Sequence, residues 1–371
     1  MAKRKKKKKQ YTHIREEFYD RLALMCDRSV FDDISATFIE RPTTFRVNTI
    51  KSNKAEIMKA LQHEGFKTRE VRWYNDAFIL TNKSKRELTD LDIYKEGKIY
   101  IQSLASMVPP IVMQPKAGEI VLDLTAAPGS KTSQIAMMMD KQGELVANDK
   151  NKIRFFKLKA NMELLGVSST SSRVTSTDDR KLGHRGISMD SLKISSRPVR
   201  PLADEVGRDD VYLSKWQFTL RMEPGTKLAL EYENYFDKIL LDAPCSAEAR
   251  FVADKPKTFA YWKPQKIKEM AYTQRKLLFA AWAALKPGGT LVYSTCTFAP
   301  EENEVQLSRL LERHSDAVLI PIELPGLKKL PVVQEWKGKS IHPDVITHSV
   351  RIQPDKEIEG FFIAKLRKKD V

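Results

Sequence analysis

The chain has 371 residues, 42% of them hydrophobic, which is enough to bury the core of one large domain or of two smaller ones. No apolar run is long enough to span a membrane, and no apolar stretch follows the basic N-terminus as in a secretory signal. The three cysteines, Cys26, Cys245 and Cys296, argue against a disulfide framework, and no Cys/His spacing suggests zinc. We therefore expect a reduced, intracellular protein without a metal ion.

The formal charge of +16 favours a polyanionic partner. Nucleic acid is favoured over membrane, because no amphipathic anchor accompanies the charge. Residues 3–9 carry seven positive charges, which leaves +9 for the rest of the chain. We expect residues 1–10 to form a disordered tail, since like charges repel and nothing apolar is available to bury. A lysine run is equally typical of a solvated tail, so the basic body is the stronger indication.

Residues 11–100 read as a small α/β domain. Phe18, Leu22 and Met25 lie at helical spacing and predict a first helix. The further expected elements are a strand at 44–49, a helix at 53–64, and short strands at 71–73 and 77–80. Exposed aromatic and basic residues of this domain could contact nucleic acid, although core packing explains Trp73 and Phe78 better.

Residues 101–371 alternate between strand and helix patterns, which predicts a parallel, doubly wound α/β sheet. The helix at 151–165 is expected to turn Ile153, Phe156, Ala160 and Leu164 inward. The other expected helices are 103–115, 133–139 and 264–285, and the expected parallel strands are 120–124, 145–147, 173–177, 238–241 and 290–294. An antiparallel pair at 350–352 and 361–366 is expected to close the sheet edge.

Residues 179–234 show no clear periodicity, which is unusual for a stretch of this length inside a compact domain. A decorative insertion is the preferred interpretation. A substrate-binding loop is the alternative.

The chain is organised around residues 119–132, E-I-V-L-D-L-T-A-A-P-G-S-K-T, which read as strand, turn and helix. This is the unit in which an α/β sheet presents a ligand at the carboxyl end of its first strand. Small side chains at Ala126, Ala127 and Gly129 let backbone N–H groups approach that ligand.

Several interpretations compete for this turn. A nucleotide-triphosphate loop would need glycines where Thr125 and Ser130 stand, and no G-x-G-x-x-G dinucleotide motif is present. An adenosine-type cofactor such as S-adenosylmethionine needs only small residues and an acid for its ribose. Asp149, twenty residues after Gly129, supplies that acid at the expected distance. An ordinary βα turn with a surface aspartate is the simplest alternative.

Polar and reactive residues follow the other predicted strands. The strand ends are residues 125–131, Asp149, Asp178, 242–245 and 294–296, and binding crevices of open α/β sheets form there. Two of the three cysteines and Lys131 are therefore expected in one crevice. A single buried free cysteine is usually inert, but a pair of them after neighbouring strands indicates chemistry.

The motifs D-L-T-A-A-P-G-S-K-T, D-A-P-C-S and Y-S-T-C-T-F-A-P-E-E-N-E resemble those of the Sun/Nop (Fmu-type) family of RNA (cytosine-5) methyltransferases. The likeness runs from Thr44 to the C-terminus, and it includes F-R-V-N-T, Q-S-L-A-S-M and G-F-F-I-A-K-L-R. The chain departs from the family pattern at Thr125, often cysteine, at Ala247, often glycine, and in the longer 179–234 insertion. The insertion affects substrate identity more than the reaction.

The resemblance implies a class I methyltransferase fold that binds S-adenosylmethionine. It implies a nucleophile at Cys296 and a second cysteine, Cys245, that releases the product, with Asp242 and Lys131 beside them. The implied cofactor-binding residues are Thr125, Ala126, Ala127, Pro128, Gly129, Ser130, Lys131, Asp149, Arg154, Asp178 and Asp242. Asp179 is an alternative to Asp178 on the adenine side.

The chemistry agrees with these residue types. Carbon 5 of cytosine is a poor nucleophile until a group such as a thiolate adds to carbon 6. A carboxylate such as Asp242 can hydrogen-bond the base edge, and a second group must remove the proton from carbon 5. The base must leave any stack to be reached. Local sequence alone does not rank Cys245 against Cys296.

We therefore expect an N-terminal RNA-binding domain at 11–100 and a methyltransferase domain at 101–371 that makes 5-methylcytosine in rRNA or tRNA. The protein is expected to be monomeric and cytoplasmic, or nucleolar in a eukaryotic cell. One alternative is a methyltransferase for exocyclic amines, which would have no use for Cys296. The others are a non-catalytic RNA-binding assembly factor and, last, an ATPase.

Overall fold

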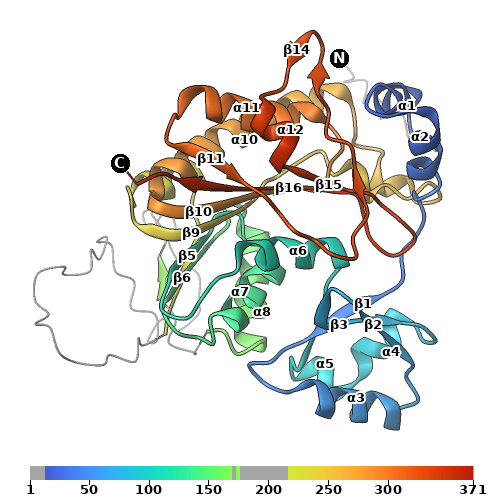
Figure 1. The fold of residues 1–371 in the computed structure, drawn as a ribbon. Coiled ribbons are helices and arrows are strands. Elements are labelled where there is room, and N and C mark those ends of the chain that lie inside the picture. Colours follow the sequence, from blue (N-terminus) through green and yellow to red (C-terminus); the bar gives the residue numbers. More distant parts are fainter. Residues whose placement is uncertain (1–12, 169–172, 176–215, 371) are drawn as a thin grey trace, which may run out of the picture.

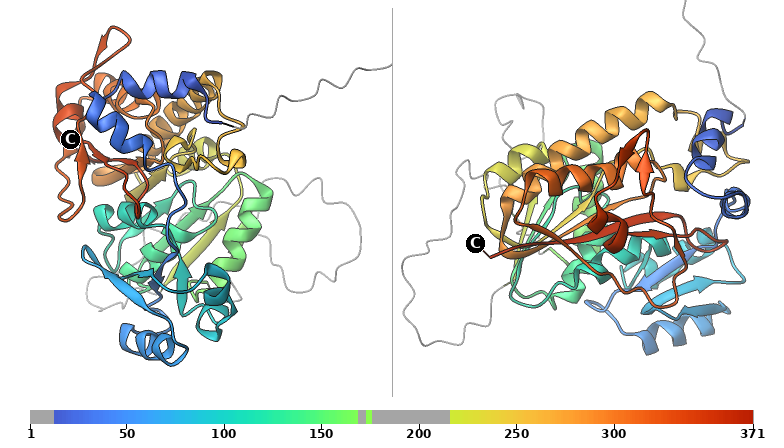
Figure 2. Two further views of the ribbon diagram at one scale, coloured as in Figure 1. Left: turned by 90° about the vertical axis from the view of Figure 1, so that its right-hand side faces the viewer. Right: turned by 45° about the horizontal axis from the view of Figure 1, so that its top comes forward.

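A computed structural model describes residues 13–168, the backbone of 173–175, and residues 216–370. The predicted disordered tail, Asp178 and Asp179 lie outside these residues. A ten-stranded sheet with helices on both faces forms the larger part, and a four-stranded sheet with its own helices forms the smaller part (Figures 1 and 2). Within the described residues, no helix combines the length and the apolar composition needed to cross a membrane.

The small sheet has the antiparallel order β2-β3-β1-β4. Its strands are β1 (Thr44–Val47), β2 (Thr68–Val71), β3 (Tyr74–Leu80) and β4 (Ile99–Ile101), and its helices are α3 (Lys54–His63), α4 (Lys85–Asp90) and α5 (Asp92–Lys95). The predicted helix at 53–64 is confirmed as α3. The side chain of Asn53 caps its first turn, and Ile57 and Leu61 are buried on its inner face, as predicted. Phe78 is fully buried, so it is a core residue.

Two short helices precede the small sheet, α1 (Glu16–Ala23) and α2 (Arg28–Ser35), and the second was not predicted. They pack against the larger part of the molecule (Figure 1). The ring of Phe18 lies 5.1 Å from that of Phe251 and 5.6 Å from that of Trp262, centroid to centroid. The division of the chain at residue 100 remains a prediction, and these contacts tie its first helices to the second part.

The large sheet has the order β12-β15-β16-β10-β9-β5-β6-β8-β7, with β11 also on β16. The strands from β10 to β7 are parallel, which confirms the doubly wound fold. The predicted antiparallel pair is confirmed as β15 and β16, and β16 also pairs antiparallel with β10. This pair does not end the sheet, because β12 pairs with β15 beyond it. The strands are β5 (Ile120–Asp123), β6 (Glu144–Asn148), β7 (Arg173–Thr175), β8 (Gln217–Arg221), β9 (Phe236–Asp242), β10 (Leu285–Thr295), β11 (Ala317–Ile320), β12 (Lys329–Leu330), β15 (Val350–Ile352) and β16 (Phe361–Lys368).

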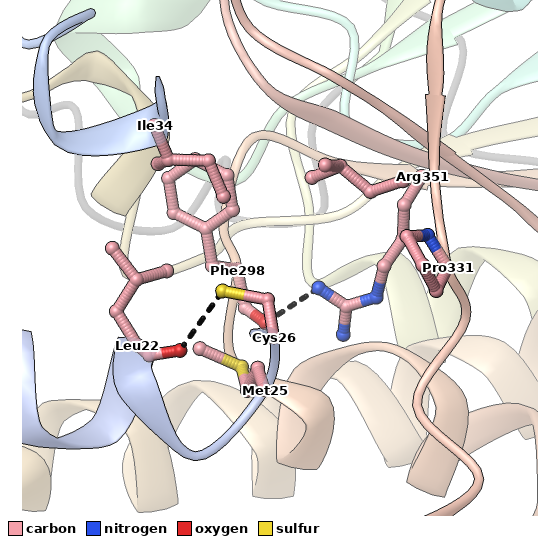
Figure 3. Close-up of a pocket in the computed structure, with 8 residues that line it drawn as sticks. Leu22, Met25, Cys26, Ile34, Phe298, Pro331 and Arg351 are labelled. Atoms are coloured by element: carbon pink, nitrogen blue, oxygen red, sulfur yellow. Dashed lines mark hydrogen bonds between the residues drawn. The ribbon is translucent and has the colours of Figure 1, made fainter. Parts of the chain in front are cut away.

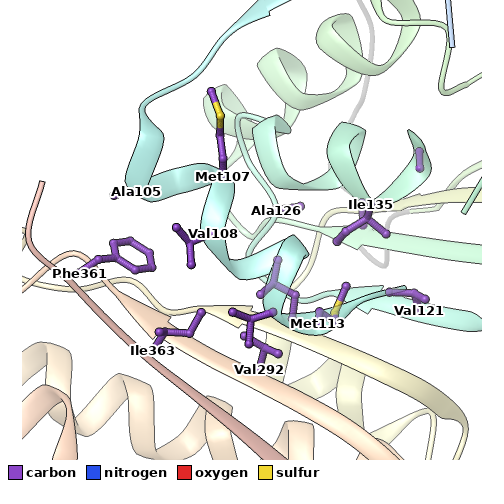
Figure 4. Close-up of a cluster of buried hydrophobic side chains, with 14 of the residues drawn as sticks. Ala105, Met107, Val108, Met113, Val121, Ala126, Ile135, Val292, Phe361 and Ile363 are labelled. Carbon is purple, nitrogen blue, oxygen red and sulfur yellow. The ribbon is translucent and has the colours of Figure 1, made fainter. Parts of the chain in front are cut away.

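Helices cover the two faces of this sheet (Figure 1). On one face lie α6 (Leu104–Met113), α7 (Ser130–Met138) and α8 (Lys152–Leu164), and on the other α9 (Gly225–Leu230), α10 (Pro264–Ala284), α11 (Glu304–Arg313) and α12 (Pro343–His348). Figure 4 shows side chains of α6, among them Val108 and Met113, on the side that faces strand residues such as Val292 and Ile363. A separate hairpin, β13 (Glu335–Trp336) and β14 (Lys339–Ser340), and the 3-10 turns Glu248–Arg250, Pro256–Thr258 and Pro300–Glu302 complete the elements.

The prediction that α8 turns Ile153, Phe156, Ala160 and Leu164 toward the core is wrong. Ile153 is 72% exposed and Phe156 is 52% exposed, whereas Phe155, Leu158 and Met162 are buried. The helix carries apolar residues on two sides, and the turn at residue 129 selects one of them, since Leu158 and Met162 lie against it.

The predicted insertion is also partly wrong, because residues 216–234 belong to the fold. They form β8 and α9, and β8 lies in the sheet between β6 and β7. The alternation of Phe218 and Leu220 with polar neighbours is a strand signal, but it is too short to stand out in a long aperiodic stretch. Residues 176–215 lie outside the described residues.

Candidate active site

A cleft of about 1260 Å³ lies at the carboxyl ends of β5, β6, β9 and β10. Its walls are the turn after β5, the first turn of α8, the loop after β9 and the residue Cys296 after β10. Thr44, Lys85 and Tyr100 of the small domain form part of its rim. The cleft therefore opens where an open α/β sheet places its ligand.

The turn after β5 is held by buried hydrogen bonds. The Thr132 hydroxyl donates to Asp123 Oδ2 at 2.7 Å, and the Ala126 N–H donates to the Asn148 carbonyl at 2.8 Å. Gly129 has a φ of 104°, and a Cβ there would lie 2.6 Å from Met162 Cε, so only glycine fits between the turn and α8. Burial raises the pKa of Asp123 to about 7.

Asp149 ends β6 and is only 4% exposed, at the wall of the cleft. Its Oδ1 accepts from the Asn151 N–H at 2.9 Å, and its Oδ2 lies 3.2 Å from the Arg154 guanidinium. Arg154 also donates to the Ala127 carbonyl at 2.5 Å, so it ties the acid to the turn after β5. The two motifs predicted to hold the cofactor are therefore physically connected.

Lys131 is tied to Asp242 and is not free to hold a phosphate. Its Nζ lies 2.7 Å from Asp242 Oδ2 and donates to Ser106 Oγ at 2.8 Å, while Ser294 Oγ donates to Asp242 Oδ1 at 2.8 Å. Lys131 is 8% exposed, and the Asp242 side chain is 30% exposed and faces the cleft. A buried lysine neutralised in this way fits an adenosine-type cofactor without phosphates better than a nucleotide triphosphate.

The two cysteines predicted to share the crevice do so, with their Sγ atoms 3.4 Å apart. The thiol of Cys245 lowers the pKa of Cys296 by donating to it, and the positive charges of Arg250 and Lys131 act in the same direction. The pKa of Cys245 is raised well above its usual value, since it is the member that keeps its proton beside a thiolate. The two thiols therefore differ in the direction of their pKa shifts, and the assignment of Cys296 as the nucleophile remains a prediction.

The third cysteine lies elsewhere. Cys26 lines a small cavity between α1, α2 and the strand β12, and its thiol donates to the Leu22 carbonyl at 3.5 Å (Figure 3). Burial raises its pKa, so it remains an unreactive thiol.

Comparison with known proteins identifies the family. The family model "16S rRNA methyltransferase RsmB/F" matches residues 110–191 and 219–367. The chain is 32% identical to the tRNA (cytosine(49)-C(5))-methyltransferase of Pyrococcus abyssi, over 97% of this chain and 98% of that one. The chain belongs to the RsmB/F family of RNA methyltransferases.

Other members of the RsmB/F family are longer than this chain. The ribosomal RNA small subunit methyltransferase F of Pectobacterium carotovorum is 33% identical over 95% of this chain, which spans only 62% of that protein. A solved methyltransferase homologue from Pyrococcus horikoshii superimposes with a TM-score of 0.72 at 29% identity and covers 96% of both chains. NSun6 from the same organism, solved with SFG, shares the fold with a TM-score of 0.68 at 22% identity.

Membership of this family confirms the resemblance, the fold class and the enzyme class expected from the sequence. The chain is an RNA (cytosine-5)-methyltransferase, and its methyl donor is S-adenosylmethionine. Membership of the RsmB/F family does not assign a specific RNA substrate or the role of each residue in the cleft.

Most of the predicted site residues of this RsmB/F chain line the one cleft. They are Thr125, Ala126, Ala127, Pro128, Ser130, Lys131, Asp149, Arg154, Asp242, Cys245 and Cys296. Gly129 does not line the cleft and instead permits the turn to pack on α8. The predicted adenine-side acid, Asp178 or Asp179, lies outside the described residues. The roles of all these residues remain predictions.

Sequence reasoning missed several residues of the cleft. Arg250 follows the D-A-P-C-S motif and supplies a positive charge to Cys296. Gly225 and Thr226 begin α9, inside the stretch interpreted as an insertion. Tyr272 is 56% exposed at the rim, with Lys276 Nζ 4.4 Å from its ring centroid. An aromatic residue paired with a lysine one helical turn later was the available signal for this last pair.

Proposed function

We propose that this enzyme methylates carbon 5 of a cytosine in tRNA or rRNA through a covalent adduct between Cys296 and carbon 6 of the base. The observation that carries the proposal is the 3.4 Å contact between Cys245 and Cys296 beside the Lys131–Asp242 pair. Two thiols, a carboxylate and an ammonium group therefore line the same cleft as the turn after β5.

The first part of the reaction belongs to Cys296. Its thiolate adds to carbon 6, forming the C–S bond and moving electron density toward carbon 5. Asp242 hydrogen-bonds the edge of the base and favours charge build-up at the ring nitrogen, while Lys131 and Ser294 hold the carboxylate in place. S-adenosylmethionine, when bound, supplies the electrophilic methyl group that carbon 5 takes.

The second part belongs to Cys245. The proton on carbon 5 must leave before the C–S bond can break and return the thiolate to Cys296. Cys245 lies close enough to Cys296 to assist this elimination. Once Cys296 is bonded to carbon 6, Cys245 releases its own proton to solvent, and its thiolate then takes the proton from carbon 5 as the C–S bond breaks; a raised pKa makes that thiolate a stronger base.

The cofactor is proposed to occupy the part of the cleft between the turn after β5 and the first turn of α8. Residues 125–131 line it with backbone and small side chains, and Asp149 presents a carboxylate for hydroxyl groups. The small domain at 11–100 is proposed to hold the RNA at the rim, and the enzyme to act as a monomer. A cytoplasmic location, or a nucleolar one in a eukaryote, is part of the same proposal.

The tRNA relative is similar along its whole length, whereas the rRNA relatives extend well beyond this chain. We take tRNA as the first substrate to test, because the relative from Pyrococcus abyssi is named as a tRNA methyltransferase. Bisulfite sequencing of total RNA from cells lacking the protein tests the assignment. We expect one or a few tRNA cytosines to lose their protection, and loss confined to rRNA would reverse the preference.

Asp149→Ala should weaken S-adenosylmethionine binding by about 1.5–3 kcal/mol, because a buried charged acceptor is lost. Calorimetric titration measures the change, and circular dichroism verifies the fold. Glu163→Ala, at the exposed end of α8, is the matched control and should bind normally. Unchanged affinity in Asp149→Ala would remove this acid from the cofactor site.

Deleting residues 1–10 should weaken RNA binding without moving the methylated position, because phosphate contacts orient the RNA but do not specify bases. The salt dependence of binding should flatten by up to ~0.7 per lost phosphate contact on single strands. A Gly/Ser tail of equal length is the control for chain length. A shifted target cytosine, or a salt slope equal to that of the full chain, would contradict this prediction.

A further inference from the structure

Each of the two loops that carry the cysteines contains a buried glutamate that accepts hydrogen bonds from the other loop, an arrangement called the glutamate exchange below. The first cysteine loop, residues 243–251, follows β9 and contains Cys245. The second cysteine loop, residues 296–303, follows β10 and begins with Cys296. Glu248 of the first loop accepts from a hydroxyl and a backbone N–H of the second loop, and Glu302 of the second loop accepts from a backbone N–H of the first. The two cysteines are 51 residues apart in sequence.

Glu248 is the carboxylate of the first cysteine loop, and it is 1% exposed. Its Oε2 accepts from Thr297 Oγ1 at 2.8 Å and from the Phe298 N–H at 3.1 Å, both in the second loop. Its Oε1 accepts from Trp262 Nε1 at 2.8 Å. Both oxygens of Glu248 are therefore acceptors.

Glu302 is the carboxylate of the second cysteine loop, and it is fully buried. Its Oε2 accepts from the Ser246 N–H at 3.0 Å, in the first loop, and from Gln274 Nε2 at 2.7 Å. Gln274 also donates to the Pro244 carbonyl at 2.9 Å, so it supports the first loop on the other side of Cys245. Within the described residues, Glu302 Oε1 has no hydrogen-bond partner.

The residues directly after each cysteine complete the connection. The hydroxyl groups of Ser246 and Thr297 are 2.7 Å apart, and the Ala249 N–H donates to the Cys296 carbonyl at 3.2 Å. Movement of one loop against the other would break several of these buried bonds together. The spacing of the cysteines is thus set by neighbours that do not line the cleft.

Packing alone does not require this arrangement. Burying two carboxylates is costly, because each loses its hydration. Burial raises the pKa of Glu302 to about 8, and it also raises that of Glu248. Directional acceptors fix a loop register that apolar side chains of equal volume would leave adjustable.

We propose that Glu248 and Glu302 are positioning residues that lock the two cysteine loops in the register where Cys245 stays in hydrogen-bond contact with Cys296. The importance of that register for methylation rests on the proposed function of the cysteine pair. Removing the hydrogen bonds of either glutamate should let the two loops move apart. Cys296 would then lose its contact with the Cys245 thiol, and its pKa should rise.

The test measures the alkylation rate of Cys296 by iodoacetamide against pH, with peptide mass spectrometry and no RNA present. We expect Glu248→Ala and Glu302→Ala to shift the midpoint of the profile upward by about one pH unit. Glu248→Gln should shift it more than Glu302→Gln, because both Glu248 oxygens accept and only one Glu302 oxygen does.

Two controls separate positioning from general destabilisation. Glu301→Gln alters the neighbouring carboxylate, which pairs with Arg21 and Lys337 outside the exchange, and should leave the profile in place. The alkylation rate of Cys26, which lines a cavity separate from the cleft, reports unfolding in the same sample. If the alanine variants fail to fold, Thr297→Val and Ser246→Ala remove single hydroxyl groups and give the same readout.

An unshifted profile in both glutamate variants, or in both hydroxyl variants if those alone fold, would overturn the proposal. An equal shift in Glu301→Gln would also overturn it. The result is independent of the methylation mechanism, since alkylation needs no substrate. A shifted profile together with full activity of Cys296→Ala would keep the positioning role and reject the covalent mechanism.

Discussion

Cys296→Ala should abolish methylation while RNA and S-adenosylmethionine still bind, because among the described residues that line the cleft Cys296 is the cysteine whose pKa is lowered, as addition to carbon 6 requires. Cys245→Ala should behave differently. The adduct still forms, but its resolution slows, so a protein–RNA complex should accumulate. A denaturing gel with labelled RNA distinguishes the two outcomes in one experiment.

Removing Cys245 also removes the hydrogen-bond donor to Cys296, so adduct formation itself should slow and shift to higher pH. Cys26→Ala is the matched control, since that cysteine lies in a separate cavity. An adduct in Cys296→Ala and none in Cys245→Ala would reverse the assignment. Full activity in both variants would remove covalent catalysis and favour an exocyclic amine as the acceptor.

Asp242→Asn should lower the single-turnover methylation rate by about 10²–10³-fold at saturating S-adenosylmethionine, comparable to the loss of one preorganised electrostatic contact. The amide keeps the shape of the carboxylate, but its nitrogen can only donate, so it keeps one of the two acceptors that now face Lys131 and Ser294 and loses the ion pair with Lys131. It also loses the carboxylate that can hold a proton on the ring nitrogen as thiolate addition builds negative charge there. The measurement is a rapid-quench time course with excess enzyme.

Asp237→Asn is the control for this variant, because Asp237 lies at the opposite end of the same strand, β9, and pairs with Lys286. It should methylate at the wild-type rate. A rate for Asp242→Asn within a few-fold of wild type, with the melting temperature unchanged, would mean that Asp242 supports the fold and not the reaction.

The sequence predicted the strand ends of the site because that information is local. Asp149, Asp242, Cys245 and Cys296 each come at most a few residues after a short apolar run that indicates a strand, and parallel strands bring their ends together. The ranking of the cysteines was not accessible in this way. It depends on the contact between the two thiols and on the positive charge of Arg250, which only the packed site brings together.

The errors have a common physical cause. Helix α8 is apolar on two sides, so its periodicity could not show that Leu158 and Met162, and not Ile153 and Phe156, meet the core. The strand β8 is short and follows a long aperiodic stretch, so its alternation carried little weight. In both cases contacts with residues distant in sequence determine the structure: the turn at residue 129 determines the buried side of α8, and pairing with β6 and β7 determines the strand β8.

The exchange of Glu248 and Glu302 was equally invisible in the sequence. Each glutamate reads locally as a polar residue in a loop, and only the fold shows that both are buried and bonded to the opposite cysteine loop. Long-range hydrogen bonds of this kind leave no periodic signal.

The central claim is that Cys296 bonds to the cytosine that becomes methylated. The most direct measurement is peptide mass spectrometry of the complex that Cys245→Ala forms with RNA and S-adenosylmethionine. We expect a nucleotide attached to the peptide containing Cys296, with the methyl group already on its cytosine. A nucleotide attached to any other residue, or 5-methylcytosine formed by Cys296→Ala at the normal rate, would contradict it.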